Sequence, residues 1–167
     1  IRDRAIRILE PLEEKFSENA AYHQNLAAAY LGANALNLAK KELDAAYRLN
    51  PFNYSVYYNY GLYYFRNKDF KNAYNNFSLA AELNPAMVSA YIYMGHSCRL
   101  QNNVRAAIYS YSLAKRFAPL NPQIAYFLGK AYFDLNEFKN AARELAIARK
   151  SNLPQEMISD IEEMEKI

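Results

Sequence analysis

A 34-residue self-similarity constrains the fold of this chain more than any other feature of its sequence. The segment at residues 54–85, YSVYYNYGLYYFRNKDFKNAYNNFSLAAELNP, reappears downstream with its small residues in the same places. The recurring positions are a glycine, two alanines and a proline: Gly61, Gly95, Gly129; Ala73, Ala107, Ala141; Ala80, Ala114, Ala148; Pro51, Pro85, Pro119. Self-similarity at such a period is typical of stacked supersecondary units, each too small to bury its own apolar face.

Each segment predicts two helices joined by a polar turn. Tyr57, Tyr60 and Tyr64 share one helical stripe, and the polar residues 66–69 follow. A second helix then begins, which the proline at the joint ends, because the residue before a proline is pushed out of the α region. A glycine in mid-helix costs up to about 1 kcal/mol relative to alanine. We therefore expect close helix approach, with Gly61 facing Ala73 and the later glycines facing the matching alanines.

This pattern resembles the tetratricopeptide repeat family, whose 34-residue consensus is W-x2-L-G-x2-Y…A-x3-F…P. The copy at residues 54–87 has Tyr57 in place of the tryptophan and Tyr60 in place of the leucine, followed by Gly61, Tyr64, Ala73, Phe77 and Pro85. The next two copies carry Tyr91, Met94, Gly95, Cys98, Ala107, Tyr111, Pro119 and Ala125, Leu128, Gly129, Tyr132, Ala141, Leu145, Pro154, the last proline being one place late. The copy before carries His23, Leu26, Ala27, Tyr30, Ala39, Leu43, Pro51, with Ala27 in place of the glycine. The resemblance implies an all-α, right-handed α-solenoid of helix–turn–helix repeats.

The predicted domain organisation is a single repeat domain over residues 1–167. It contains a half-repeat helix (1–19), four repeats (20–53, 54–87, 88–121, 122–154) and a capping helix (155–167) with an apolar stripe of Ile158, Ile161 and Met164. Pro11 interrupts the half-repeat, so we expect a bend or two short helices there. The sequence starts at Ile1 and not at a methionine, so we expect it to belong to a longer or processed protein, or to a larger complex.

Charge and composition narrow the partner class. The net charge of +3 combines a mildly basic repeat body with acidic ends. This pattern slightly favours an acidic or carboxylate-bearing partner. No apolar run is long enough for a membrane span. The single cysteine, Cys98, takes the place of Tyr64 and is expected to be a buried thiol.

The sequence contains no motif for catalysis or cofactor binding. The two histidines, His23 and His96, lie two repeats apart, and no metal-binding or phosphate-binding motif is found. We therefore predict a non-enzyme with no catalytic residue, no metal and no cofactor.

A second stripe on the first helices points to a binding surface. It includes Tyr58, Leu62 and Phe65, which have nothing to pack on within a simple hairpin. The family resemblance implies that first helices line a concave ligand groove. Aromatic rings provide anchors there, and asparagine amides can bond a peptide main chain. The predicted partner-binding residues are Tyr58, Asn59, Tyr93, His96, Tyr126 and Lys130, of which Asn59, Tyr93, His96 and Lys130 are expected to be the most exposed.

The predicted function is non-catalytic protein–protein interaction, as a scaffold or adaptor that binds an acidic or hydrophobic peptide segment of a partner. We expect about half of the second stripe to pack between neighbouring repeats and the other half to form ligand surface. A dedicated chaperone for a secreted or assembled subunit is the first alternative. RNA binding is less favoured, because Arg66, Arg99 and Lys130 are few cations for a ligand bound through its phosphates.

Overall fold

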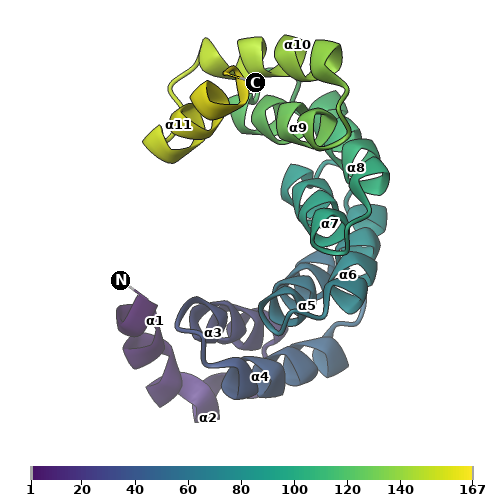
Figure 1. The fold of residues 1–167 in the computed structure, drawn as a ribbon. Coiled ribbons are helices and arrows are strands. Elements are labelled where there is room, and N and C mark those ends of the chain that lie inside the picture. The colour runs from purple at the N-terminus through teal and green to yellow at the C-terminus, as the bar shows by residue number, and fades with distance from the viewer. Residues whose placement is uncertain (1, 167) are drawn as a thin grey trace. The chain divides into compact units, whose positions relative to one another are not determined.

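A computed structural model of the chain describes residues 2–166, which contain helices and connecting turns and no strand (Figure 1). Ile1 and Ile167, the ends of the predicted domain, lie outside the described residues. The helices are α1 (Arg2–Leu9), η1 (Glu10–Leu12), α2 (Glu13–Phe16), α3 (Ala20–Gly32), α4 (Leu36–Leu49), α5 (Tyr54–Arg66), α6 (Phe70–Leu83), α7 (Val88–Leu100), α8 (Val104–Phe117), α9 (Pro122–Asp134), α10 (Phe138–Arg149) and α11 (Gln155–Met164). No helix in this part of the chain is long and apolar enough to cross a membrane.

The internal contacts divide the chain into two compact units, Ile1–Met87 and Val88–Ile167. The division falls where the third predicted repeat begins. Unit 1 holds the hairpins α3–α4 and α5–α6, and unit 2 holds α7–α8 and α9–α10. The predicted helix–turn–helix repeats are therefore present in both units.

The turn inside each hairpin has the same backbone conformation. One residue in each turn adopts a left-handed conformation, with φ between 59° and 61°. These residues, spaced by 34, are Asn34, Lys68, Asn102 and Asn136. Asparagine tolerates this region better than most residues, because its side chain can hydrogen-bond locally. Lys68 is the exception in the set.

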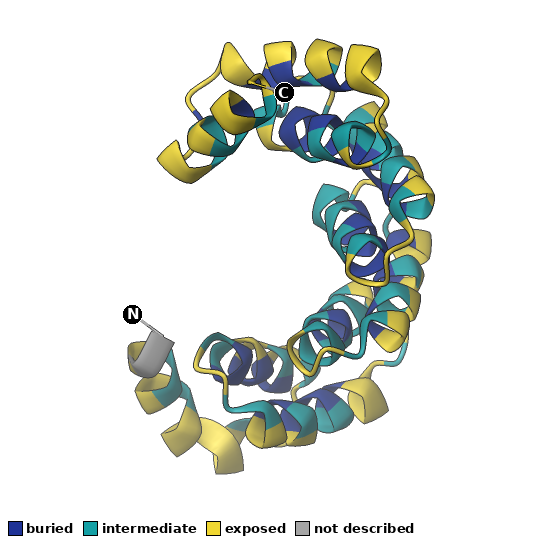
Figure 2. Cartoon of the chain, viewed as in Figure 1, coloured by how far each residue is buried: buried dark blue, intermediate teal, exposed yellow. Residues whose placement is uncertain are grey.

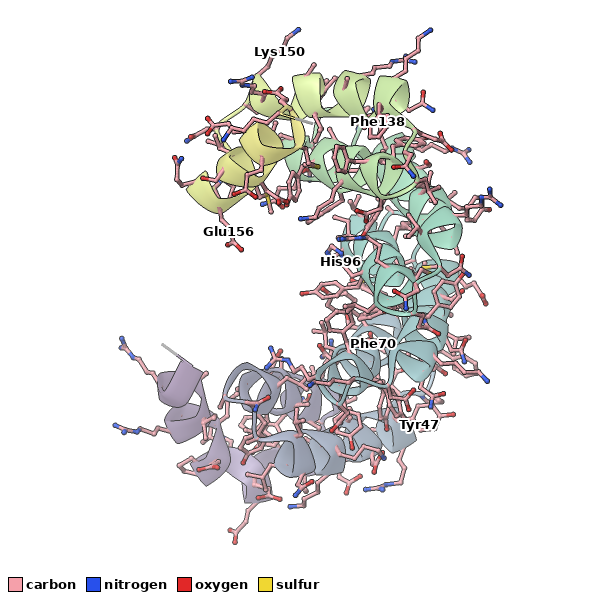
Figure 3. All side chains as sticks on the ribbon, in the orientation of Figure 1. Tyr47, Phe70, His96, Phe138, Lys150 and Glu156 are labelled. Atoms are coloured by element: carbon pink, nitrogen blue, oxygen red, sulfur yellow. The ribbon has the colours of Figure 1, made fainter. Side chains whose placement is uncertain are left out.

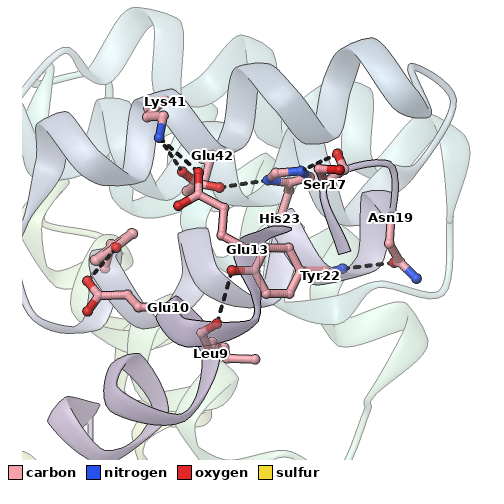
Figure 4. Close-up of polar contacts among 10 residues, drawn as sticks. Leu9, Glu10, Glu13, Ser17, Asn19, Tyr22, His23, Lys41 and Glu42 are labelled. Carbon is pink, nitrogen blue, oxygen red and sulfur yellow. Dashed lines mark hydrogen bonds and ion pairs between the residues drawn. The ribbon is translucent and has the colours of Figure 1, made fainter. Parts of the chain in front are cut away.

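The half-repeat is bent at the predicted place. Pro11 lies in the short 3-10 helix η1, which separates α1 from α2, so the prediction of two short helices is confirmed. Figure 4 shows how this segment is attached to the first hairpin: the Tyr22 hydroxyl donates to the Leu9 carbonyl at 3.0 Å. Nε2 of the buried His23 donates to the Ser17 carbonyl at 2.8 Å, and its Nδ1 lies 2.7 Å from the buried Glu42 carboxylate.

The glycines face large side chains and not the alanines that we predicted. The closest atoms to a Cβ built on Gly61 belong to the ring of Phe77, one turn beyond Ala73. The other pairs are Gly95 with Tyr111 and Gly129 with Leu145. The hairpin needs the glycine because the second helix inserts a large side chain into the space above it. Within each unit the buried residues gather between the paired helices, while one side of α4, α8 and α10 is exposed (Figure 2).

Helix α11 packs on the last hairpin. Ile161 is almost fully buried, in a cluster with Tyr126, Leu145 and Leu153. Ile158 and Met164, the other members of the predicted stripe, pack against the same cluster. The apolar stripe therefore serves to attach the helix to unit 2.

Candidate functional site

The six predicted partner-binding residues are divided between the two units. Tyr58 and Asn59 lie on α5 in unit 1, and the other four lie on α7 and α9 in unit 2. The two groups are therefore described separately.

In unit 1 the second stripe packs within its own hairpin. The Tyr58 ring lies 5.5 Å from the ring of Phe77 on α6, and the Phe65 ring lies 5.4 Å from that of Phe70. The expectation that this stripe has nothing to pack on in a hairpin is therefore wrong. The physical reason is the space at Gly61, through which Phe77 reaches the stripe.

The burial of Asn59 contradicts a second expectation. We predicted it to be among the most exposed residues of the stripe, but it is only 7% exposed. Its polar side chain sits on a face of α5 that is largely covered. The sequence pattern could not show this, because exposure depends on neighbours that lie far away along the chain.

In unit 2 a group of contacting rings, here called the aromatic face, joins α7 to α9. It consists of Tyr93 and His96 on α7 and Tyr126 and Phe127 on α9. The His96 ring meets Phe127 edge-on at 4.5 Å between centroids, and meets Tyr93 edge-on at 5.7 Å. Phe127 continues the row to Tyr126 at 5.4 Å. Edge-to-face pairs at these distances are favourable, so the rings hold one another in place. Tyr93, His96 and Phe127 are partly buried.

His96 is held by a residue of α8. Its Nδ1 lies 2.8 Å from the hydroxyl of Tyr111, the residue that also fills the space at Gly95. Burial, and then the charge of Arg99, lower the pKa of His96 to about 4. Burial is also the main cause that raises the pKa of Tyr111. The histidine is therefore neutral at physiological pH, and its Nδ1 shares one hydrogen bond with the Tyr111 hydroxyl. Figure 3 labels His96 on α7.

Helix α11 engages the two remaining predicted residues. The Asp160 carboxylate accepts hydrogen bonds from the Tyr126 hydroxyl and from the Lys130 ammonium. Burial alone would raise the pKa of Asp160, but these two bonds and the cationic charges lower it below its usual value. Tyr126 is 7% exposed, so its ring is mostly covered. Lys130, which we predicted to be among the most exposed of the six residues, is partly exposed and forms an ion pair with Asp160.

The cations considered for RNA binding are also engaged. Arg66 donates to the Leu31 carbonyl, and Arg99 forms an ion pair with Asp134 at 3.2 Å. Lys130 is paired with Asp160. Carboxylates neutralise Arg99 and Lys130, and Arg66 already donates within the protein, so this set offers little for a nucleic acid.

Sequence reasoning missed three residues of this arrangement. Tyr111 was named only as a position of the repeat pattern, and Phe127 and Asp160 were not singled out. A signal existed for Asp160, which lies one repeat period after Tyr126. That spacing places α11 in register with the first helices, where contact with α9 is expected.

The described residues contain no group of three or more His, Cys, Asp or Glu side chains placed to hold a metal ion. Cys98 is buried, as predicted, and burial raises the pKa of its thiol. A thiol in this state is a poor nucleophile.

The sequence of the chain matches the model of one protein family, described as tetratricopeptide repeat, over residues 25–88 and 94–156. These two segments make up well over half of its length. The chain belongs to the tetratricopeptide repeat family. The predicted all-α fold of repeated helix–turn–helix hairpins is confirmed.

Solved structures of tetratricopeptide proteins have the same fold. A crystal structure of MamA is 21% identical with a TM-score of 0.80, and the match covers 89% of this chain and 87% of that one. A second MamA crystal structure is 20% identical with a TM-score of 0.78, covering 92% and 89%. The pilF protein of Pseudomonas aeruginosa is 16% identical with a TM-score of 0.75, covering 93% and 79%. Comparison with curated proteins gives no match.

Proposed function

We propose that this tetratricopeptide chain is a non-catalytic protein–protein interaction module, and that the aromatic face of unit 2 binds a hydrophobic peptide segment of a partner. The supporting observation is the row of contacting rings from Tyr93 through His96 to Phe127. Rings held in place by one another provide apolar contact area without a large loss of side-chain freedom on binding.

The charges near the aromatic face favour a hydrophobic partner over an acidic one. Lys130 and Arg99 are already paired with Asp160 and Asp134. A partner carboxylate would have to replace an existing ion pair, which removes most of the gain. His96 is neutral, so it adds no positive charge that would attract a partner carboxylate.

Of the six predicted residues, Tyr93, His96 and Lys130 are the main candidates for contact with the partner. Asn59 and Tyr126 are almost fully buried, and Tyr58 belongs to unit 1. Phe127 is added to the site because it connects His96 with Tyr126.

Selection of peptides from a random phage-displayed library against the intact chain tests this proposal. Selected peptides should contain apolar anchors, and the double variant Tyr93→Ala, His96→Leu should bind them about thirtyfold more weakly, the effect of losing about 2 kcal/mol at an anchor. Leucine is chosen because Leu62 occupies the place of His96 in the previous repeat.

The control is the double variant Arg105→Glu, Arg116→Glu, which changes two exposed cations of α8. It should retain the affinity of the parent. Equal binding by the parent and by the Tyr93→Ala, His96→Leu variant, with circular dichroism showing both folded, would exclude the aromatic face as the site.

A further inference from the structure

Unit 1 contains a hollow that none of the predicted partner-binding residues lines. It lies between α4, α5 and α6 and is lined by Lys40, Tyr47, Tyr57, Tyr60, Tyr64 and Asn76. We call it the tyrosine pocket. Its volume is about 260 Å³, below the roughly 300–1,000 Å³ of typical small-molecule sites. A pocket of this size suits one or two residues of a peptide better than a complete cofactor.

In unit 2, other residues take the places of the pocket tyrosines. Sixty-eight residues later, in unit 2, the places of Tyr57 and Tyr60 are taken by Ala125 and Leu128, each only 2% exposed. The places of Tyr47 and Asn76 are taken by Lys115 and Glu144, which form an ion pair at 2.5 Å. The equivalent region of unit 2 is therefore packed and bridged, whereas unit 1 has rings around an open hollow.

The hydroxyl groups of two pocket tyrosines are used inside the protein. Tyr57 donates to the Pro51 carbonyl at 2.9 Å, and Tyr60 donates to the Asp44 carboxylate at 2.6 Å. Tyr47 stands nearly perpendicular to both, with centroid distances of 6.1 Å to Tyr57 and 6.4 Å to Tyr60. With these two hydroxyl groups engaged, the rings of Tyr47, Tyr57 and Tyr60 present faces and edges to the pocket, beside the polar ends of Lys40 and Asn76.

The charge of the pocket is internally compensated. The Lys40 ammonium lies 5.6 Å from the centre of the Tyr60 ring and is bonded to both Asp44 oxygens, at 2.6 and 2.8 Å. A cationic ligand would be repelled by this ammonium, which already lies over the Tyr60 ring. An anionic ligand would meet electron-rich rings and a cation already neutralised by Asp44. The electrostatic complement of the pocket is therefore an uncharged group whose C–H bonds carry partial positive charge.

Proline has these properties. Its ring is uncharged, the C–H groups beside its amide nitrogen are electron-poor, and a polyproline II segment presents rings and carbonyl oxygens without losing much chain entropy on binding. The Lys40 ammonium has a third hydrogen beyond the two that Asp44 accepts, and this hydrogen can reach a peptide carbonyl. We propose that the tyrosine pocket binds a proline-rich segment of a partner protein, at a site separate from the aromatic face.

A fluorescein-labelled peptide of ten prolines, titrated against the intact chain by fluorescence anisotropy, tests this inference. We expect saturable binding that is at least tenfold tighter than the binding of equally long glycine–serine, polyglutamate and polylysine peptides. Tighter binding of any of these three peptides, or no saturable binding of the proline peptide, would overturn the proposal.

Variants locate the site. Tyr47→Ala, which removes a side chain that is 42% exposed, and Tyr57→Ala, Tyr60→Leu, which installs the residues of unit 2, should each weaken binding at least tenfold. Tyr109→Ala, a change at a tyrosine of α8 that is 64% exposed, is the matched control and should bind like the parent. Unchanged affinity in folded Tyr47→Ala protein would show that the peptide binds elsewhere. The Tyr93→Ala, His96→Leu variant should bind the proline peptide normally, so the two proposals can fail independently.

Discussion

Gly61 of α5 lies directly against the ring of Phe77 of α6, so that a Cβ atom at position 61 would stand 2.5 Å from two of the ring carbons. The Phe77 ring is fully buried and continues to Tyr58 on the second stripe. One missing methyl group therefore determines both how closely the hairpin closes and what the face of the first helix can pack on. Gly95 with Tyr111 repeats this relationship in unit 2, where Tyr111 holds His96.

The first prediction concerns this contact. Gly61→Ala should destabilise the chain, because overpacking a buried site costs about 1–3 kcal/mol, which exceeds the gain of up to about 1 kcal/mol in helix propensity. Urea denaturation followed by circular dichroism measures the difference. In a Phe77→Ala background the same change should be neutral or stabilising, since the opposing ring is gone. An equal cost in both backgrounds would show that the ring is not the cause.

The second prediction concerns the hairpin turn at Lys68. Its φ of 60° is shared with Asn34, Asn102 and Asn136, and a left-handed conformation costs an ordinary residue about 1–2 kcal/mol. Lys68→Asn should therefore raise the free energy of unfolding by part of this amount, and Asn102→Lys should lower it. Thermal unfolding of both variants, with Lys71→Asn as a control at an exposed helical position, measures the effect. A loss of stability in Lys68→Asn would contradict the argument.

The fold was predictable because the repeat period and the positions of glycine, alanine and proline are properties of the sequence alone. The partners across each hairpin were less predictable. Gly61 indicated that the two helices approach closely. It did not indicate whether Ala73 or Phe77 fills the space, since both lie on the same face of α6. That choice depends on how far one helix is displaced along the other.

The candidate site was only partly predictable for a related reason. Helical spacing put Tyr93 and His96 on one stripe, and the structure places their rings in contact. The same spacing could not reveal that Asp160 reaches Lys130 and Tyr126, because that contact depends on the docking of α11. Nor could the spacing show that Tyr57, Tyr60 and Tyr64 line a pocket, since they lie on the helical stripe that was expected to pack within the hairpin.

The third prediction is a pH dependence of stability. The pKa of His96 is lowered to about 4 by burial and by Arg99, whereas that of an unfolded histidine is about 6.5. Between these values the unfolded state binds more protons, so stability is complete above pH 6.5 and falls as the pH is lowered toward 4. His96→Leu should lack this component. Urea denaturation at pH 7 and pH 5 should show a larger loss for the parent than for the variant, and equal losses would rule out His96 as the source.

The last prediction concerns the attachment of α11. The Asp160 carboxylate binds both Tyr126 and Lys130, while Ile161 provides the apolar contact. Asp160→Asn removes the charge that pairs with Lys130, so α11 should open locally more often while the hairpins stay closed. Hydrogen exchange at neutral pH should accelerate in residues 155–164 and remain unchanged in α9.

Because its partners lower the pKa of Asp160, the parent should show the same loosening only in acid, as the pH falls through that lowered value. Glu162→Gln, at an exposed acid on the same helix, is the matched control. If Asp160→Asn exchanges no faster than this control, the contacts of Ile161 alone hold the helix in place.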